Sequence, residues 1–228
     1  MYKNRTFLGI IPARGGSKRL PRKNVLNLSG KPLISWTIEA GLRSRYIDKL
    51  VVSSEDEEIL GVAAQHRVET LTRPDELADD RSSSFDTIKH TLDNSEEYDY
   101  IILLQATSPL RNQEHIDKAI ELLEEKNADA IISVCETDHN PLWSNTIDDS
   151  LSMKEFLKDH VLNKRSQDLE KYYELNGAIY ICKVSKLLEE KGFFLKDNIY
   201  AFKMDRESSI DIDEKIDFKI AEALIESN

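Results

Sequence analysis

Short apolar runs alternate with amphipathic helical segments along most of this chain, and this alternation constrains the fold more than any other feature. The clearest run, YIILL at 100–104, has the length and composition of a buried strand. Strands that alternate with helices favour a parallel sheet with right-handed crossovers. We therefore predict a mainly parallel α/β sheet with helices on both faces. The expected strands cover residues 7–11, 50–54, 68–71, 100–104, 130–134, 176–182 and 198–202.

The first strand leads into an unusually basic loop, in the stretch FLGIIPARGGSKRLPRKN at 7–24. Pro12 should end the strand because proline has no N–H to donate to the ladder. Gly15 and Gly16 allow the backbone to bend and to approach a ligand closely. Free N–H groups and cations at the carboxyl end of a strand suit a polyphosphate, although a basic surface turn is the alternative. The cations of this loop include Arg14, Lys18, Arg22 and Lys23.

Two common nucleotide motifs are missing from this sequence. It contains neither GxxxxGK[ST] nor GxGxxG, which argues against a P-loop enzyme and against a dinucleotide site. The formal net charge of −11 and the pI of about 5.0 make a general nucleic-acid coat a poor fit, so an anionic substrate needs a local basic pocket. With 228 residues the chain has room for one α/β domain and a small insertion.

Neither a signal peptide nor a long apolar span is present, so we expect a cytoplasmic protein that contacts no membrane. Cys135 and Cys182 both lie in apolar runs and are expected to be buried, unpaired hydrophobic residues.

Three later segments also place polar side chains where strands end. The serines before the helix at 85–92 either cap it or offer a hydrogen-bonding edge to a base or ribose, and Gln105 follows the YIILL strand. In SSIDID at 208–213, strand alternation puts Asp211 and Asp213 on one side. Paired carboxylates suit Mg²⁺ bound together with substrate phosphates, whereas Asp213 alone could simply cap the last helix.

Residues 139–175 interrupt the alternating pattern. The segment is polar and irregular, with at most a short helix at 153–157, and it is too long for an ordinary connection. We interpret it as an inserted arm, and residues 1–138 and 176–228 as the α/β domain.

Five motifs in order and spacing give this chain a close resemblance to the CMP-sialic acid synthetases, the N-acylneuraminate cytidylyltransferases. They are ARGGSKRLPRKN, RPDELADDRSSS, LLQATSPLR, LNGAIYI and SIDID, and the likeness runs from about Phe7 to the end of the chain. The resemblance implies a Rossmann-like nucleotide-diphospho-sugar transferase fold and a homodimer joined through the arm. It also implies Mg²⁺-assisted attack of the anomeric hydroxyl of an N-acylneuraminate on the α-phosphorus of CTP, which releases diphosphate.

The resemblance also assigns roles to individual residues. Lys23, Arg14 and Asp211 would be catalytic, with Lys23 stabilising the charged transition state. The nucleotide would be bound by Ala13, Arg14, Gly15, Gly16, Ser17, Lys18, Lys23, Asn24, Arg73, Ser82 and Ser84. The sugar would be bound by Gln105, Tyr180, Phe193, Phe194, Arg165 and Gln167, of which the last two reach the neighbouring subunit's site. Asp211 and Asp213 would hold the Mg²⁺.

Some positions depart from the family pattern and leave the sugar open. Arg19 stands where relatives often have glycine, and Trp143 and Glu174 stand where some sialic acid enzymes have basic residues. The alternatives are a cytidylyltransferase for legionaminate, pseudaminate or 3-deoxy-manno-octulosonate, and a non-catalytic nucleotide-binding protein on the same fold. The carboxylate pair argues against the last, because binding alone would not require it together with the basic loop.

Overall fold

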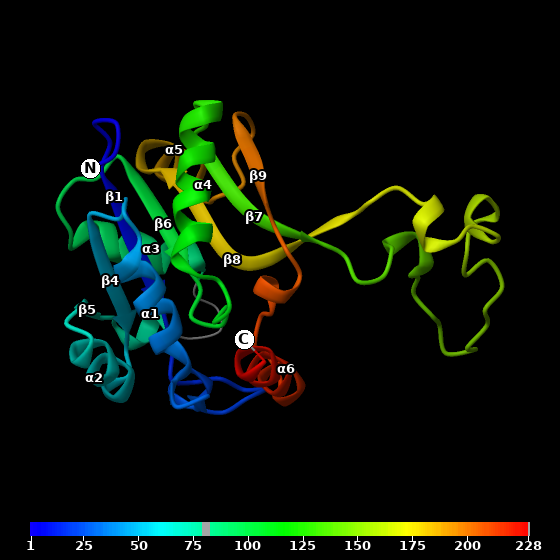
Figure 1. Ribbon diagram of the computed structural model, residues 1–228, viewed down its shortest axis with the longest axis horizontal. Helices are drawn as coiled ribbons and strands as arrows, with labels where there is room; N and C mark the ends of the chain where they lie inside the picture. The colour runs from blue at the N-terminus through cyan, green and yellow to red at the C-terminus, as the bar shows by residue number, and fades with distance from the viewer. Residues whose placement is uncertain (79–82, 228) are drawn as a thin grey trace.

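A computed structural model of the chain describes residues 1–78 and 83–227 and shows a seven-stranded sheet in the order β5-β4-β1-β6-β8-β7-β9 (Figure 1). Neighbours pair in parallel except at β8, which runs antiparallel to both β6 and β7. The mainly parallel α/β fold expected from the sequence is confirmed. The strands are β1 Phe7–Pro12, β4 Lys49–Ser54, β5 Glu69–Thr72, β6 Tyr100–Leu104, β7 Ala130–Glu136, β8 Tyr173–Lys183 and β9 Ile199–Met204, with β2 Asn27–Leu28 and β3 Lys31–Pro32 forming a separate two-stranded ribbon.

Helices cover both faces of the large sheet because its strands carry apolar side chains on both sides. On β1, Phe7 and Ile11 pack with α1, α2 and α4, whereas Leu8 and Ile10 pack against the face that α3 and α5 cover. A third apolar cluster joins α6 to the ribbon and to the buried Ile212. The helices are α1 Leu33–Arg43, α2 Glu57–Gln65, α3 Ser84–Asp93, α4 Gln113–Lys126, α5 Val184–Glu190 and α6 Lys215–Glu226.

The direction of β8 follows from the segment that precedes it. Parallel neighbours need a crossover that packs on the sheet, usually through a helix. Between β7 and β8 the chain has only short 3-10 turns, at 141–143, 159–161 and 166–168. The chain therefore leaves the sheet and returns beside β7 in the opposite direction, and Glu136 pairs with Tyr173 at the base of the excursion.

The inserted segment extends away from the body of the molecule (Figure 1). The short helix considered possible at 153–157 does not form, because these residues make only a turn in which Phe156 N–H donates to Met153 C=O at 3.1 Å. Glu155 has a φ of 62°, a left-handed conformation that a right-handed helix cannot contain. Both cysteines are buried and unpaired, as expected. Within residues 1–78 and 83–227, none of the helices is both long enough and apolar enough to cross a membrane.

Candidate active site

The carboxyl ends of the parallel strands meet at one edge of the sheet, where a cavity of about 470 Å³ opens. Open α/β sheets bind ligands at this edge. The cavity lies between the loop after β1, the start of α3 and the residues that follow β6. It is lined by Pro12, Ala13, Arg14, Lys23, Asn24, Arg73, Leu77, Ala78, Ser83, Ser84, Thr87, Leu103, Gln105, Ala106, Thr107, Asp211 and Asp213.

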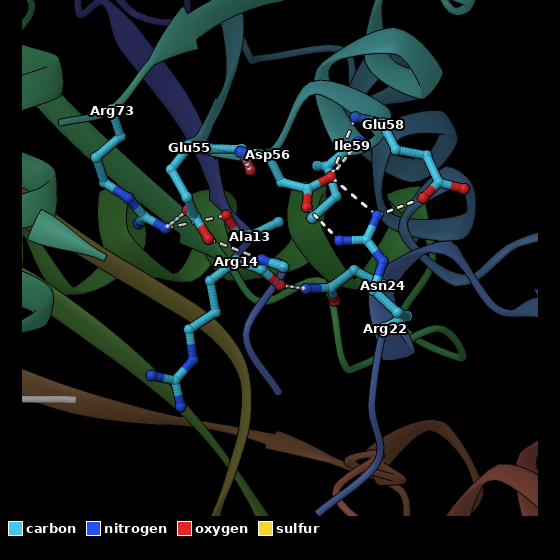
Figure 2. Close-up of polar contacts among 11 residues, drawn as sticks. Ala13, Arg14, Arg22, Asn24, Glu55, Asp56, Glu58, Ile59 and Arg73 are labelled. Atoms are coloured by element: carbon cyan, nitrogen blue, oxygen red, sulfur yellow. Dashed lines mark hydrogen bonds and ion pairs between the residues drawn. The ribbon is translucent and has the colours of Figure 1, made fainter. Parts of the chain in front are cut away.

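The basic loop is held in place by hydrogen bonds to its backbone (Figure 2). Gly15 N–H donates to Glu55 Oε1 at 2.8 Å, and Ser17 N–H donates to Gly15 C=O at 3.0 Å. The expectation of free amides is therefore wrong for these two residues. Asn24 Nδ2 donates to Arg14 C=O at 2.9 Å, which ties the two ends of the loop together. The loop reaches the cavity mainly through its side chains.

The far end of the loop is fixed to the start of α2. Arg22 adopts a left-handed conformation, with φ 59°, and forms ion pairs with Asp56 and Glu58 (Figure 2). The hydrogen bonds from Arg22 lower the pKa of the Asp56 carboxyl. Asp56 also accepts from Glu58 N–H and Ile59 N–H and so caps α2.

The two glycines of this loop should respond differently to replacement. A Cβ at Gly15 would overlap the Asp56 carboxylate, whose Cγ would lie only 3.0 Å away, whereas a Cβ at Gly16 meets nothing within 4 Å. Because Asp56 is held by Arg22 and by the helix cap, it cannot easily move. We expect Gly15→Ala to lower the free energy of unfolding by about 1–3 kcal/mol and Gly16→Ala to leave it nearly unchanged. Urea unfolding of both variants tests this, and equal losses would contradict it.

Lys23 lies inside the cavity and is already engaged with the last predicted motif. Its Nζ donates to Asp213 Oδ1 at 2.9 Å and to Ile212 C=O at 2.7 Å, and its side chain is only 13% exposed. Arg19 pairs with the other oxygen of Asp213 at 2.9 Å. Burial raises the pKa of Asp213, but the hydrogen bond and charge of Lys23 outweigh burial and leave this pKa below its usual value.

Asp211 is more buried than Asp213 and lacks a comparable cation. Burial raises the pKa of its carboxyl, and the Thr107 hydroxyl and the charge of Lys23 only partly oppose this. Its Oδ1 atom is buried with no hydrogen-bond partner among the described residues. A carboxylate oxygen left in this way at a cavity wall costs free energy unless a ligand or ion meets it.

The segment that carries both carboxylates is extended but is not part of a strand. One backbone bond, from Ile212 N–H to Thr107 C=O at 2.8 Å, ties it to the residues after β6. Asn176 adds a second tie by donating to Ser209 Oγ at 2.9 Å. The expected alternation is nevertheless confirmed, since Ile212 is fully buried while the two aspartates line the cavity.

A second, larger cavity of about 880 Å³ adjoins the first and is mostly apolar. Its wall includes Tyr180 on β8 and the two phenylalanines that follow α5, Phe193 and Phe194. The Tyr180 and Phe193 rings lie 5.4 Å apart, whereas Phe194 is 62% exposed. The two cavities share Ser83, Ser84, Leu103 and Gln105. Gln105 thus stands between a polar, charged cavity and an apolar one.

The backbone beside Gln105 needs a glycine. Gly177 on β8 has a φ of 71°, and a Cβ there would lie 3.3 Å from Gln105 Oε1 and 3.5 Å from Asp211 Oδ2. An L side chain would be strained and would push on both groups. Gly177 therefore lets β8 pass close to the two side chains at the junction of the cavities.

Comparison with known proteins agrees with this arrangement. The sequence pattern described as "Cytidylyltransferase" matches residues 8–228. The chain belongs to the cytidylyltransferase family. An N-acylneuraminate cytidylyltransferase from Escherichia coli is 38% identical over 94% of this chain, but the match covers only 51% of that protein. The chain thus spans about half the length of the neuraminate relatives it matches, including those from Streptococcus agalactiae.

Two bacterial members of the family match over nearly their full length. The CMP-N,N'-diacetyllegionaminic acid synthase of Legionella pneumophila is 36% identical, and the pseudaminic acid cytidylyltransferase of Campylobacter jejuni is 34% identical, each over 97% of both chains. A solved CMP:2-keto-3-deoxy-manno-octonic acid synthetase complexed with CTP superposes with a TM-score of 0.72 at 17% identity, covering 97% of this chain and 99% of that one, and so supports the fold.

The structure brings most of the predicted site residues together in this member of the family. Ala13, Arg14, Lys23, Asn24, Arg73, Ser84, Asp211 and Asp213 line the first cavity, Tyr180, Phe193 and Phe194 line the second, and Gln105 lines both. Ser83 is the helix cap, since its hydroxyl accepts from Asp86 N–H in a capping box. Ser82 lies outside the described residues.

Other predicted residues do not line either cavity within the described chain. They are Gly15, Gly16, Ser17 and Lys18 in the basic loop and Arg165 and Gln167 on the arm. The two arm residues are exposed, as is Glu174, while Trp143 is half-buried. Sequence reasoning missed the cavity-lining Thr87 and Thr107 and the loop partner Glu55. Nothing in the local pattern marks the threonines, and Glu55 is indistinguishable from an ordinary acidic residue at a helix start.

Proposed function

We propose that this chain is an N-acylneuraminate cytidylyltransferase, which joins CTP and an N-acylneuraminate into the CMP-sugar and diphosphate. The observation that carries the proposal is the junction at Gln105 of a charged cavity and an apolar one. A nucleotide and an acylated sugar that occupy adjoining cavities would meet at this junction. Proximity of this kind removes much of the entropic barrier to a reaction between two substrates.

The charged cavity suits the triphosphate of CTP. Arg14 and Lys23 bring cations to the wall, and Ser84, at the start of α3, adds a hydroxyl for the base or ribose. In-line attack by the anomeric hydroxyl on the α-phosphorus places extra negative charge on the phosphate oxygens, which Lys23 is placed to stabilise. Diphosphate leaves as the new phosphate ester bond forms, and no covalent enzyme intermediate is needed.

The two aspartates fit Mg²⁺. Asp211 offers a buried carboxylate oxygen without a partner among the described residues, and Asp213 stands two residues away on the same cavity wall. Oxygen ligands from one or two carboxylates, completed by substrate phosphates, are what this ion prefers. Bound there, Mg²⁺ would neutralise phosphate charge. Lys23, which now pairs with Asp213, would then be available to the phosphates.

The apolar cavity suits an N-acylated sugar. Phe193 and Phe194 offer a wall for an acyl group, while Tyr180 and Gln105 offer polar atoms for the sugar ring. N,N'-diacetyllegionaminate is the second candidate, because this wall is mostly apolar and a second acyl group would fit it. Trp143 and Glu174 also stand where some neuraminate enzymes have basic residues, and a relative that is 36% identical to this chain is named a CMP-N,N'-diacetyllegionaminic acid synthase.

We further propose a cytoplasmic homodimer joined through the arm. The arm exposes large apolar side chains that a second copy would cover, with Leu151 76% exposed and Met153 59% exposed. The exposed Arg165 and Gln167 would then reach the sugar in the neighbouring subunit's site. Exposed apolar side chains on the arm and a site shared between subunits both fit an isologous pair.

Mixed dimers test the shared site. Arg165→Ala and Lys23→Ala chains should each be nearly inactive alone. Co-expressed with different tags, they should recover about a quarter of wild-type activity, since half of the dimers are mixed and each mixed dimer keeps one intact site. No recovery in purified mixed dimers would show that Arg165 acts within its own subunit.

The reaction itself is tested by diphosphate release from CTP and Mg²⁺ with N-acetylneuraminate and N,N'-diacetyllegionaminate side by side. Release with N-acetylneuraminate supports the proposed function. If diphosphate is released only with the legionaminate, the proposed reaction is retained and the proposed sugar substrate is replaced by the legionaminate. If a folded protein releases diphosphate with neither sugar, nor with pseudaminate or 3-deoxy-manno-octulosonate, the proposal fails.

A further inference from the structure

Glu55 connects two walls of the charged cavity through a single carboxylate. It lies between the end of β4 and the start of α2, and its side chain is 16% exposed. One oxygen, Oε1, accepts from Gly15 N–H at 2.8 Å, and the other, Oε2, accepts from Arg73 Nη2 at 2.7 Å (Figure 2). Both oxygens are therefore committed to protein donors.

Arg73 extends this connection back to the first strand. It is 5% exposed, and the same Nη2 that contacts Glu55 also donates to Ala13 C=O at 3.0 Å. Its Nη1 reaches Thr87 Oγ1 on α3 at 3.4 Å. The contacts form a closed ring from Ala13 through Arg73 and Glu55 to Gly15, with Arg14 as the one residue between its ends.

The ring leaves the backbone around Arg14 little freedom. Ala13 C=O is held by Arg73, Gly15 N–H by Glu55, and Arg14 C=O by Asn24. The Arg14 side chain extends away from these contacts (Figure 2). We propose that Glu55 is a positioning residue for the nucleotide, which fixes the backbone at Arg14 and holds Arg73 against the base side of the cavity.

A carboxylate is required here for a chemical reason. Glu55 faces two donors, an amide N–H and a guanidinium, and only a carboxylate offers an acceptor to each. A glutamine would turn its NH₂ group toward one of the two donors. Its charge also balances Arg73, because a buried cation without a partner is strongly unfavourable. Placing a negative charge near a polyphosphate site opposes anion binding, so the carboxylate needs a compensating role such as this.

The neighbouring acidic residues provide matched controls. Asp56 and Glu58 contact Arg22, not Arg73. Glu57 is exposed, and its side chain makes no hydrogen bond or ion pair with the described residues. Glu57→Gln therefore removes the same charge from the same helix end without touching the ring. Glu55→Asp keeps two acceptors on a side chain one methylene shorter.

The proposal rests on the proposed function, because it concerns how CTP is held. We expect Glu55→Gln to raise the Kd and the KM for CTP by about tenfold to a hundredfold, the effect of losing a hydrogen bond to a charged group. The KM for the sugar should be unchanged, because the ring does not touch Gln105 or Tyr180. The kcat should fall by a smaller factor than the Kd for CTP rises, because Lys23 and Asp211 lie outside the ring although Arg14 lies within it. Glu55→Asp should recover part of the affinity, and Glu57→Gln should match the wild type.

Calorimetric titration of CTP with Mg²⁺, alongside steady-state rates and thermal melts, separates the outcomes. A rise in the Kd and KM for CTP that exceeds any fall in kcat, with the KM for the sugar unchanged and partial rescue by Glu55→Asp, supports the role. CTP affinity in Glu55→Gln equal to that in Glu57→Gln overturns it. The role is also overturned if both KM values rise and kcat falls to similar extents while the melting temperature drops, because such a pattern reflects a general loss of folding. A wild-type protein that neither binds CTP nor releases diphosphate overturns the proposed function, and this inference with it.

Discussion

Replacing Lys23 with alanine is expected to lower kcat by about three orders of magnitude, the upper range for removal of one preorganised donor to a developing charge. Lys23 Nζ lies in the charged cavity on a side chain that is only 13% exposed, so little water would replace it. The fold should survive, because the substitution removes one ion pair with the partly exposed Asp213 and one hydrogen bond to Ile212 C=O. Diphosphate release under saturating CTP and sugar measures the effect.

The matched control for this variant is Arg19→Ala. Arg19 pairs with the same aspartate, but its side chain is 64% exposed and does not line either cavity. We expect its removal to cost less than about tenfold, as for an exposed ion pair. The role given to Lys23 is wrong if the Lys23→Ala variant has the wild-type kcat. It is also wrong if the fall in kcat is explained by a protein that is already unfolded at the assay temperature.

Asp211→Asn is expected to reduce turnover by about 10³-fold or more, because a neutral amide is a poor ligand for a hard cation. The same change should leave the melting temperature unchanged or raise it. Burial raises the pKa of Asp211, so its charged form is less stable in the folded protein than in the unfolded chain. At pH 7 the carboxylate therefore opposes folding, and an amide of the same shape removes that cost.

A large loss of turnover without a loss of thermal stability distinguishes Asp211 from a residue that only supports the fold. Turnover across a Mg²⁺ titration and a thermal melt at pH 7 measure the two quantities. Asp197→Asn, at an exposed position just before β9, removes the same charge from a side chain that lines neither cavity and should change neither quantity. If Asp211→Asn keeps wild-type turnover at every Mg²⁺ concentration, Asp211 is not a ligand of the metal ion.

Some features of the site follow from local pattern alone. Asp211 and Asp213 share the cavity wall because an extended chain alternates its side chains, and this held although the segment forms no strand. Gln105 lies at the junction because it directly follows the most apolar run in the chain. The short helix considered possible at 153–157 does not form, and Glu155 within it has a left-handed φ of 62° that a right-handed helix cannot contain.

Other features depended on residues far apart in the sequence. The amide of Gly15 was expected to be free, yet it is bonded to Glu55, which is separated from it by 40 positions. The family resemblance placed Arg73 in the nucleotide pocket. Its contacts with Ala13 and Glu55 show that it also holds the wall of the cavity in place. Rules based on local charge or helix capping do not predict which distant donor will hydrogen-bond to a given carboxylate.

The sequence by itself determined the α/β class, the edge of the sheet that carries the site, and most of the side chains that line it. These depend on periodicity, on strand ends and on short motifs, which are properties of neighbouring residues. Only the tertiary structure decided that β8 runs antiparallel, that two cavities join at Gln105, and that Glu55 closes a ring behind Arg14. Such contacts arise when distant segments pack together, and the direction and partner of each are set by the whole fold.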